Sequence, residues 1–170
     1  MEWTEANLDK LAADIAADPT LSTLPHNGDS AVVVAEAYNL PAQPDFWVWK
    51  TALQEQEVYE ATAPDGTTWN WATYKGQSVQ DRDSWTRMFN PGVVNPALKQ
   101  TRDGWLAIFG GQGASQAQVN YLLAFSRRLA SRTEKLYANT AQGAGSTAAP
   151  ATMVFEGMLT PSLVEQAWAE

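Results

Sequence analysis

The chain has no cysteine and a single histidine, His26. A disulfide framework, a thiol nucleophile and a zinc-thiolate site are therefore excluded. His26 lies in a Pro-His-Asn-Gly turn, where we expect a surface position rather than a general base or a metal ligand. A catalytic triad that depends on histidine gains no support from this sequence.

Long apolar runs are also absent. No run approaches the roughly 18 to 20 residues that a membrane-spanning helix needs. The acidic N-terminal segment, MEWTEANLDK, has neither the basic nor the apolar region of a secretion signal. Of the 170 residues, 45% are hydrophobic and 18% are charged, which is typical of a globular protein about one domain in size. We expect the protein to stay in the compartment where it is made.

Each remaining candidate for catalysis or metal binding has a simpler structural explanation. Asp81 and Asp83 are two residues apart on a predicted helix, so their carboxylates point to different sides. Glu55, Glu57 and Glu60 lie on a polar helix face with no partner carboxylate identified. The glycine-rich segment 110–115 follows a helix and lacks the lysine of a phosphate-binding loop. We predict no catalytic residue, no metal site and no cofactor, and we expect a protein that is not an enzyme.

Charge is distributed unevenly along the chain, whose formal net charge is -8. Residues 1–65 contain twelve acidic and two basic residues, residues 66–140 nine basic and four acidic ones, and residues 141–170 three acidic ones. Opposite charges in the two halves could neutralise each other within one fold. They could equally favour head-to-tail contact between copies, which generates rings or filaments.

Hydrophobic periodicity predicts an all-α fold, with a bundle of about six helices in a domain formed by residues 1–139. The predicted helices cover residues 5–17, 31–39, 52–61, 79–89, 96–109 and 115–138. Expected N-caps are Thr4, Asp29 or Ser30, Thr51, Ser78, Asn95 and Ser115. The segment 46–50 reads as extended chain, a strand-like arm or a helical turn. Segment 69–74 reads as a short strand or an irregular loop.

The longest predicted helix, residues 115–138, is expected to be the central core helix. Its apolar side is formed by Val119, Leu122, Phe125, Leu129, Thr133, Leu136 and Tyr137. Ser115 and Gln118 have the spacing of a capping box. The short loop before this helix predicts that it packs beside the helix that ends at Phe109.

A basic stripe is predicted on the flank of this central helix. Arg128, Arg132 and Lys135 follow one another at helical spacing, with Arg127 adjacent and Tyr121 on the same flank. Three interpretations stay open: solvated or intramolecular pairing, contact with another protein, and weak, salt-sensitive contact with nucleic acid. The eight tryptophans are unusual for this length, and Trp47, Trp49, Trp69 and Trp71 are either core residues or interface anchors.

Residues 140–170 are predicted to be a flexible linker, an extended apolar arm and a terminal helix. The small, uncharged residues around 139–152 are typical of a linker. Met153, Val154 and Phe155 belong to the apolar arm, which must lie back on the domain, add to a sheet edge or dock on another subunit. Trp168 in the last helix is available for burial. The arm and Trp168 complete the candidate interface residues.

Two parts of the chain resemble a family of small proteins that tailed bacteriophages and prophages encode among their virion genes. These parts are ADPTLSTLPHNGDSAVVVAEAYNLPAQPDFWVWKT near the start, and RRLASRTEKLYA with GSTAAPATMVFEGMLT near the end. The family has no assigned catalytic or binding residues to carry over. The resemblance implies a virion structural protein and, within that class, a head-tail connector or neck component.

These observations lead to the expectation of a ring-forming adaptor between portal and tail, located in the virion and assembled in the host cytoplasm. Its expected partners are copies of itself and the portal, tail or other virion proteins, with no membrane and only incidental contact with nucleic acid. A capsid decoration or tail-attached protein is the nearest alternative. A phage-encoded regulator or DNA-binding helper is the alternative from another class.

Overall fold

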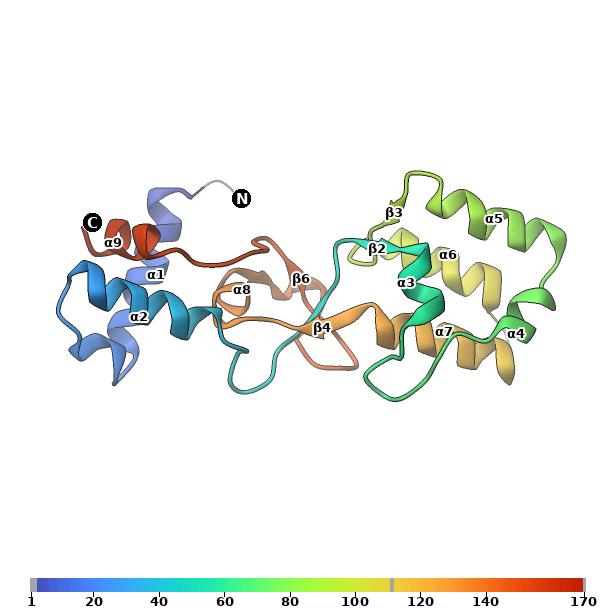
Figure 1. The fold of residues 1–170 in the computed structure, drawn as a ribbon, viewed down its shortest axis with the longest axis horizontal. Helices are drawn as coiled ribbons and strands as arrows, with labels where there is room; N and C mark the ends of the chain where they lie inside the picture. Colours follow the sequence, from blue (N-terminus) through green and yellow to red (C-terminus); the bar gives the residue numbers. More distant parts are fainter. Residues whose placement is uncertain (1–2, 111, 170) are drawn as a thin grey trace. The chain divides into compact units, whose positions relative to one another are not determined.

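The chain folds into two compact units, each with its own core, in a computed structural model that describes residues 3–110 and 112–169 (Figure 1). Residues 1–47 and 129–170 form the first unit, which we call the terminal unit. Residues 48–128 form the second, which we call the inserted unit. The predicted division at residue 139 falls inside the terminal unit.

The described residues are mostly helical. The α-helices are α1 (Glu5–Ala17), α2 (Gly28–Asn39), α3 (Glu55–Glu60), α4 (Trp71–Lys75), α5 (Val79–Phe89), α6 (Lys99–Phe109), α7 (Ala114–Phe125), α8 (Arg132–Tyr137) and α9 (Pro161–Ala169). Short 3-10 helices cover Leu21–Thr23 and Thr140–Gln142. The strands are β1 (Trp47–Trp49), β2 (Leu53–Gln54), β3 (Val93–Val94), β4 (Arg127–Leu129), β5 (Ala138–Asn139) and β6 (Thr152–Met153).

The predicted α-rich fold is confirmed, although the chain is not purely α-helical. The strands of the described residues pair as β1 with β4, β2 with β3, and β5 with β6. β2 and β3 are antiparallel, with Leu53 opposite Val94. These ladders are too short to stand alone and depend on the helices around them.

The core of the terminal unit joins the two ends of the chain. Helix α9 packs against both α1 and α2, as Figure 1 shows. Leu11, Val34 and Val164 contribute one fully buried side chain from each helix. Apolar residues recur every three or four positions on α1, so one face of this helix can be buried completely. The prediction of helices at both ends of the chain is confirmed.

The core of the inserted unit is rich in aromatic side chains. It is built mainly from α3, α5, α6 and α7, and α6 packs against α7 as predicted. Trp85, Trp105 and Phe109 are completely buried. The indole Nε1 of Trp85 donates a hydrogen bond of 2.9 Å to the Tyr59 hydroxyl, which satisfies its polar edge. One core per unit replaces the single core expected for a chain of this size.

The predicted central helix 115–138 is wrong, because the chain leaves the helix after Phe125. The Ser126 carbonyl accepts a hydrogen bond from the Lys50 backbone, and strand β4 follows. Helix α8 then begins with its own capping box. The Ser131 hydroxyl accepts from the Glu134 backbone at 3.2 Å, and the Glu134 carboxylate accepts from the Ser131 backbone at 2.9 Å. These reciprocal bonds favour a new helix start over a continuous helix.

Several predicted caps and segments also differ from the structure. Helix α7 has Gly113 as its N-cap residue, and Gln118 is buried and accepts a hydrogen bond from the Asn70 backbone. The prediction of Ser78 as the cap of α5 is confirmed. The segment predicted as a strand or loop over residues 69–74 contains α4, which begins after Asn70. The Asn70 side chain accepts from the Thr73 backbone and so starts this short helix.

The C-terminal arm lies back on the terminal unit. Strand β6 pairs antiparallel with β5, with Met153 opposite Ala138. The linker before it is hydrogen-bonded to β1, since the Trp47 backbone donates to Gly145 and accepts from Ala151. Phe155 is buried and packs edge-on against Tyr137, with ring centroids 6.3 Å apart. Of the three placements expected for the arm, the structure shows docking on its own unit as an added strand.

Candidate functional site

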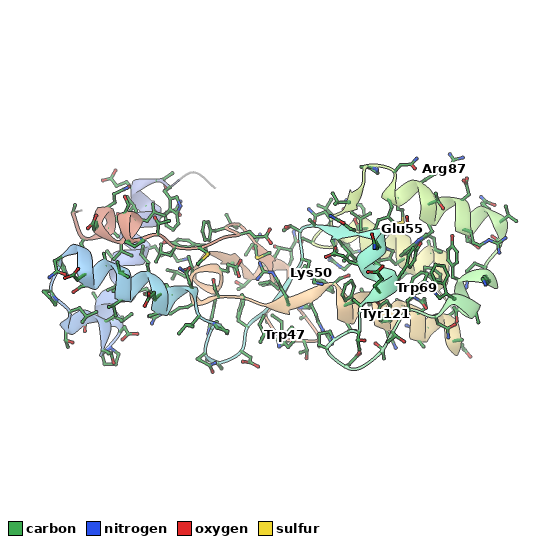
Figure 2. All side chains as sticks on the ribbon, viewed as in Figure 1. Trp47, Lys50, Glu55, Trp69, Arg87 and Tyr121 are labelled. Atoms are coloured by element: carbon green, nitrogen blue, oxygen red, sulfur yellow. The ribbon has the colours of Figure 1, made fainter. Side chains whose placement is uncertain are left out.

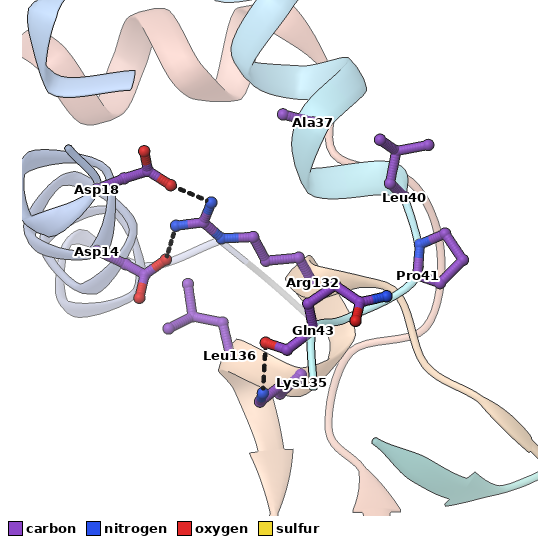
Figure 3. Close-up of a pocket in the computed structure, with 9 residues that line it drawn as sticks. All are labelled: Asp14, Asp18, Ala37, Leu40, Pro41, Gln43, Arg132, Lys135 and Leu136. Atoms are coloured by element: carbon purple, nitrogen blue, oxygen red, sulfur yellow. Dashed lines mark hydrogen bonds and ion pairs between the residues drawn. The ribbon is translucent and has the colours of Figure 1, made fainter. Parts of the chain in front are cut away.

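A groove of about 680 Å³ opens on the terminal unit beside α1, α2 and α8 (Figure 3). Its polar lining consists of Asp14, Asp18, Gln43, Arg132 and Lys135. Its apolar lining consists of Ala37, Leu40, Pro41 and Leu136. The volume lies within the about 300 to 1,000 Å³ typical of binding sites. The groove contains two residues of the predicted basic stripe, Arg132 and Lys135.

Arg132 holds the acidic side of the groove in place. Its guanidinium forms ion pairs with Asp14 at 2.9 Å and with Asp18 at 2.6 Å (Figure 3). The same guanidinium lies over the Tyr38 ring, 4.2 Å from its centroid. The Tyr38 hydroxyl donates a hydrogen bond of 2.5 Å to Asp14. Planar stacking and two-carboxylate pairing both use the geometry of arginine, which lysine cannot reproduce.

These contacts determine the protonation states of Asp18, Arg132 and Tyr38. The backbone N–H of Leu21, followed by the Arg132 guanidinium, lowers the pKa of the Asp18 carboxyl from 3.8 to about 2. Burial acts to lower the pKa of Arg132, but its hydrogen bonds to Asp18 and Asp14 outweigh burial and raise it. Burial, with the hydrogen bond to Asp14, raises the pKa of Tyr38. Near neutral pH the network is therefore ionised at Asp18 and Arg132 and neutral at Tyr38.

Lys135 also lines the groove and follows Arg132 by three positions on α8, so the two lie on the same helix face. Its Nζ donates to the backbone carbonyls of Gln43 at 3.2 Å and Pro44 at 3.4 Å. It also lies 5.8 Å from the centre of the Phe46 ring. These three partners are uncharged, and Lys135 is the second basic residue of the groove lining beside Arg132.

An apolar stripe on α2 continues into the groove. Val33, Ala37 and Leu40 follow one another at helical spacing, and the last two line the groove. Val33 is 48% exposed and Leu40 is 63% exposed. Large apolar side chains that lie exposed in a row beside a groove are typical of a surface that another protein covers.

The predicted basic stripe does not form a continuous helix face, because the helix that would carry it is broken at Ser126. Arg127 and Arg128 lie on β4 in the inserted unit, whereas Arg132 and Lys135 lie on α8 in the terminal unit. Tyr121, predicted on the same flank, is buried in the inserted unit. Its hydroxyl donates a hydrogen bond of 2.5 Å to the Val58 carbonyl, and burial raises its pKa to about 12.

The other candidate interface residues are distributed over the terminal unit. Met153 lies in β6, Phe155 is buried, and Val154 is exposed. Trp168 on α9 stacks on His26, with ring centroids 4.6 Å apart and planes 4° from parallel. The predicted surface position of His26 is confirmed, since the side chain is exposed.

The tryptophans divide between the two interpretations that the sequence left open. Trp49 and Trp69 are buried, whereas Trp71 is 47% exposed on the inserted unit. The Trp71 ring is held by Tyr59 at 4.6 Å and by Tyr74 at 5.8 Å between centroids. Figure 2 labels Trp69 in this aromatic region of the inserted unit. We call Trp71 with Tyr59 and Tyr74 the aromatic surface cluster.

Two basic residues lie beside this cluster. Lys75 is exposed and follows Trp71 by four positions on α4, so the two lie on the same side of the helix. The Arg82 guanidinium donates a hydrogen bond of 2.7 Å to the Lys75 carbonyl. The sequence prediction missed this grouping because it did not identify α4. Asn70 lies three residues before Thr73, which is the spacing of an N-cap, and this was the signal that could have revealed α4.

Metal binding and membrane insertion were also assessed over residues 3–110 and 112–169. In this part of the chain no group of three or more His, Asp or Glu side chains is placed to hold a metal ion. No helix within the same ranges has the length and apolar character required to span a bilayer.

A scan against protein-family models found no match, and neither the curated proteins nor the solved structures gave one.

Proposed function

We propose that the protein is a non-enzymatic structural component of a tailed-bacteriophage particle and acts as a ring-forming adaptor between portal and tail. The observation that carries the proposal is the distribution of charge between the two units. The terminal unit has twelve acidic and three basic residues, a net charge of -9. The inserted unit has seven acidic and eight basic residues, a net charge of +1.

This distribution favours one mode of self-association over another. Two terminal units repel each other, so a symmetric contact between them is disfavoured. A contact between the terminal unit of one copy and the inserted unit of the next avoids this repulsion. Such a heterologous contact uses two different surfaces of each copy, and it produces a ring when the rotation between copies closes.

The exposed surfaces support a binding role. The groove with its apolar stripe lies on the terminal unit, and the aromatic surface cluster lies on the inserted unit. Each copy therefore has one candidate binding surface per unit. The resemblance of residues 17–51, 127–138 and 145–160 to tailed-phage proteins is the reason for placing such an assembly in a virion.

In this proposal the C-terminal arm does not carry the contact between copies, because it docks on its own unit. If the arm docked on another subunit, deleting residues 145–170 would leave a folded domain that no longer assembles. In the structure this segment includes α9, whose Val164 and Ala167 are buried against α1 and α2. The deletion would remove part of a core, so it cannot separate folding from assembly.

Quantitative mass spectrometry of purified particles tests the proposal. The measured quantity is the copy number of this chain relative to the portal protein. A number close to that of the portal ring, about a dozen, is the expected result. Hundreds of copies would indicate a capsid decoration or tail role instead. Absence from particles, together with salt-sensitive binding to DNA, would favour the regulator.

A further inference from the structure

We propose that the groove of one copy binds Trp71 of a second copy, with Lys75 and Arg82 facing the acidic terminal unit. The inference rests on the proposed self-association and names the two surfaces that meet. It concerns a contact between different copies, in which the inserted unit of one provides the aromatic anchor and the terminal unit of the other receives it.

Trp71 has the properties of an interface anchor. The residue is 47% exposed, although tryptophan carries a large apolar surface. The ring is held in one orientation by Tyr59, and Trp69 supports it edge-on at 5.9 Å between centroids and 80° between planes. An aromatic side chain that is already ordered loses little conformational entropy on binding. Tryptophan is also among the residues enriched at the energetic centre of interfaces.

The groove has the complementary composition. Leu40 and Pro41 form an apolar wall that can cover an indole ring. The polar lining has two acidic and two basic side chains, because Asp14 and Asp18 both pair with Arg132 and Lys135 also lines the groove. An uncharged apolar ring therefore suits the groove itself. Positive charge beside that ring would face the acidic surface of the terminal unit outside the groove. A second copy supplies the ring and the positive charge from a single region of α4 and α5.

Charge complementarity selects the second copy over a partner of another kind. Lys75 lies one helical turn from Trp71, and Arg82 is tied to the Lys75 carbonyl at 2.7 Å. Both cations accompany Trp71 wherever it docks. The receiving unit has a net charge of -9, which attracts this basic edge and repels a second acidic unit.

The test uses one variant for each surface. Trp71→Ala removes the anchor and leaves the groove intact. Leu40→Asp places a charge on the apolar wall of the groove, where Leu40 is 63% exposed, and leaves the anchor intact. The assembly mass of each purified full-length variant is measured by sedimentation velocity. Each variant alone is expected to be monomeric, with self-association weakened by about 30-fold or more.

Mixing the two variants gives the decisive result. The intact Trp71 of the Leu40→Asp chain can enter the intact groove of the Trp71→Ala chain. The Leu40→Asp chain has an altered groove and the Trp71→Ala chain lacks the anchor. No further copy can therefore add to the pair, and association stops at a one-to-one heterodimer. Its formation also shows that both variants are folded.

Matched controls change equally exposed apolar residues elsewhere. Leu106→Ala alters a 44% exposed residue on α6 of the inserted unit, and Val154→Asp alters a 56% exposed residue outside the groove lining. Both are expected to assemble like the wild type. If Trp71→Ala assembled like the wild type, the proposed contact would be wrong. The contact would also be wrong if the two variants were monomeric alone and failed to pair when mixed. Neither result would contradict the proposed self-association. A monomeric wild type would overturn both proposals.

Discussion

Arg132 and Asp18 form an ion pair of 2.6 Å between residues 114 positions apart in the sequence. The pair joins α8 to the end of α1 and borders the groove on the terminal unit. Asp18 also accepts hydrogen bonds from the Thr20 and Leu21 backbones, so its carboxylate is held from two sides. The groove is therefore supported by contacts between the N-terminal and C-terminal parts of the chain.

Replacing Arg132 by Ala should destabilise the terminal unit by about 1 to 3 kcal/mol. The change leaves Asp14 and Asp18 without their common partner in a half-buried environment, where Arg132 is 29% exposed. Urea denaturation measures the effect. Arg87→Ala is the matched control, because its pair with Asp83 is well exposed, and its removal should cost about 0.5 kcal/mol or less. Equal effects of the two substitutions would contradict the structural role of Arg132.

The pH dependence of stability should contain a contribution from Asp18. Its pKa is 3.8 when unperturbed and about 2 in the folded protein. A carboxyl whose folded pKa is lowered stabilises the fold above its unfolded pKa, and this contribution is lost as the pH falls through the folded value. The free energy of unfolding should therefore fall between about pH 4 and about pH 2.

The Asp18→Asn variant isolates this contribution, because its side chain does not titrate. Urea denaturation at several pH values should show that the wild type exceeds the variant in stability at about pH 5. The difference should shrink on approach to about pH 3. A difference that is constant over this range would show that the Asp18 carboxylate is not stabilised in the folded state.

Tyr121→Phe should destabilise the inserted unit by about 1 kcal/mol. The substitution keeps the ring but leaves the buried Val58 carbonyl without the 2.5 Å hydrogen bond that it accepts. In a spectrophotometric titration, the wild type should contain two tyrosines that ionise at about pH 12, Tyr121 and Tyr137, and Tyr121→Phe should lose one of them. Unchanged stability together with the loss of a tyrosine that ionises at its ordinary value of about pH 10 would place the Tyr121 hydroxyl in solvent.

Val164→Ala should loosen the terminal unit selectively. Val164 is fully buried on α9, so the shorter side chain leaves a cavity among α1, α2 and α9 and costs about 2 kcal/mol. Amide hydrogen exchange should accelerate over residues 5–39 and 161–169, while α5, α6 and α7 keep their protection. Faster exchange spread equally over both units would contradict the assignment of separate cores.

Much of the helical content could be predicted from the sequence, because several segments contain apolar residues at helical spacing, an N-cap residue, or both. Helix α5 has the Ser78 cap with Asp81 three residues later, and α1 has apolar residues on one face. The Ser78 hydroxyl accepts from the Asp81 backbone and so stabilises the start of α5. Thr4 makes no capping hydrogen bond, so α1 depends on burial of its apolar face. Helix α9 begins at Pro161, a residue that favours the first helical position.

The break at Ser126 could not be predicted from periodicity. Apolar residues continue at helical spacing from Val119 to Tyr137, yet the segments on either side of the break belong to different units. Pairing of β4 with β1 is a contact between distant residues, and such contacts override local preference. The Ser131 and Glu134 capping box was the one local signal against a continuous helix.

The candidate site was predicted only in part for the same reason. Arg132 and Lys135 were selected from their spacing, and both line the groove. Their partners, Asp14, Asp18 and the carbonyls of Gln43 and Pro44, lie about 90 to 120 positions away, beyond the reach of a local pattern. The exposure of Trp71 likewise depends on how α4 is placed, which the aromatic composition alone does not determine.

Sedimentation velocity of the wild-type chain over a range of concentrations tests the central claim most directly. Self-association through two different surfaces predicts that the mass rises from the chain's own 18.6 kDa to a single larger species, which is a closed ring. High salt should weaken this association, because the charges of the two units contribute to it. A mass of 18.6 kDa at every concentration would contradict the account.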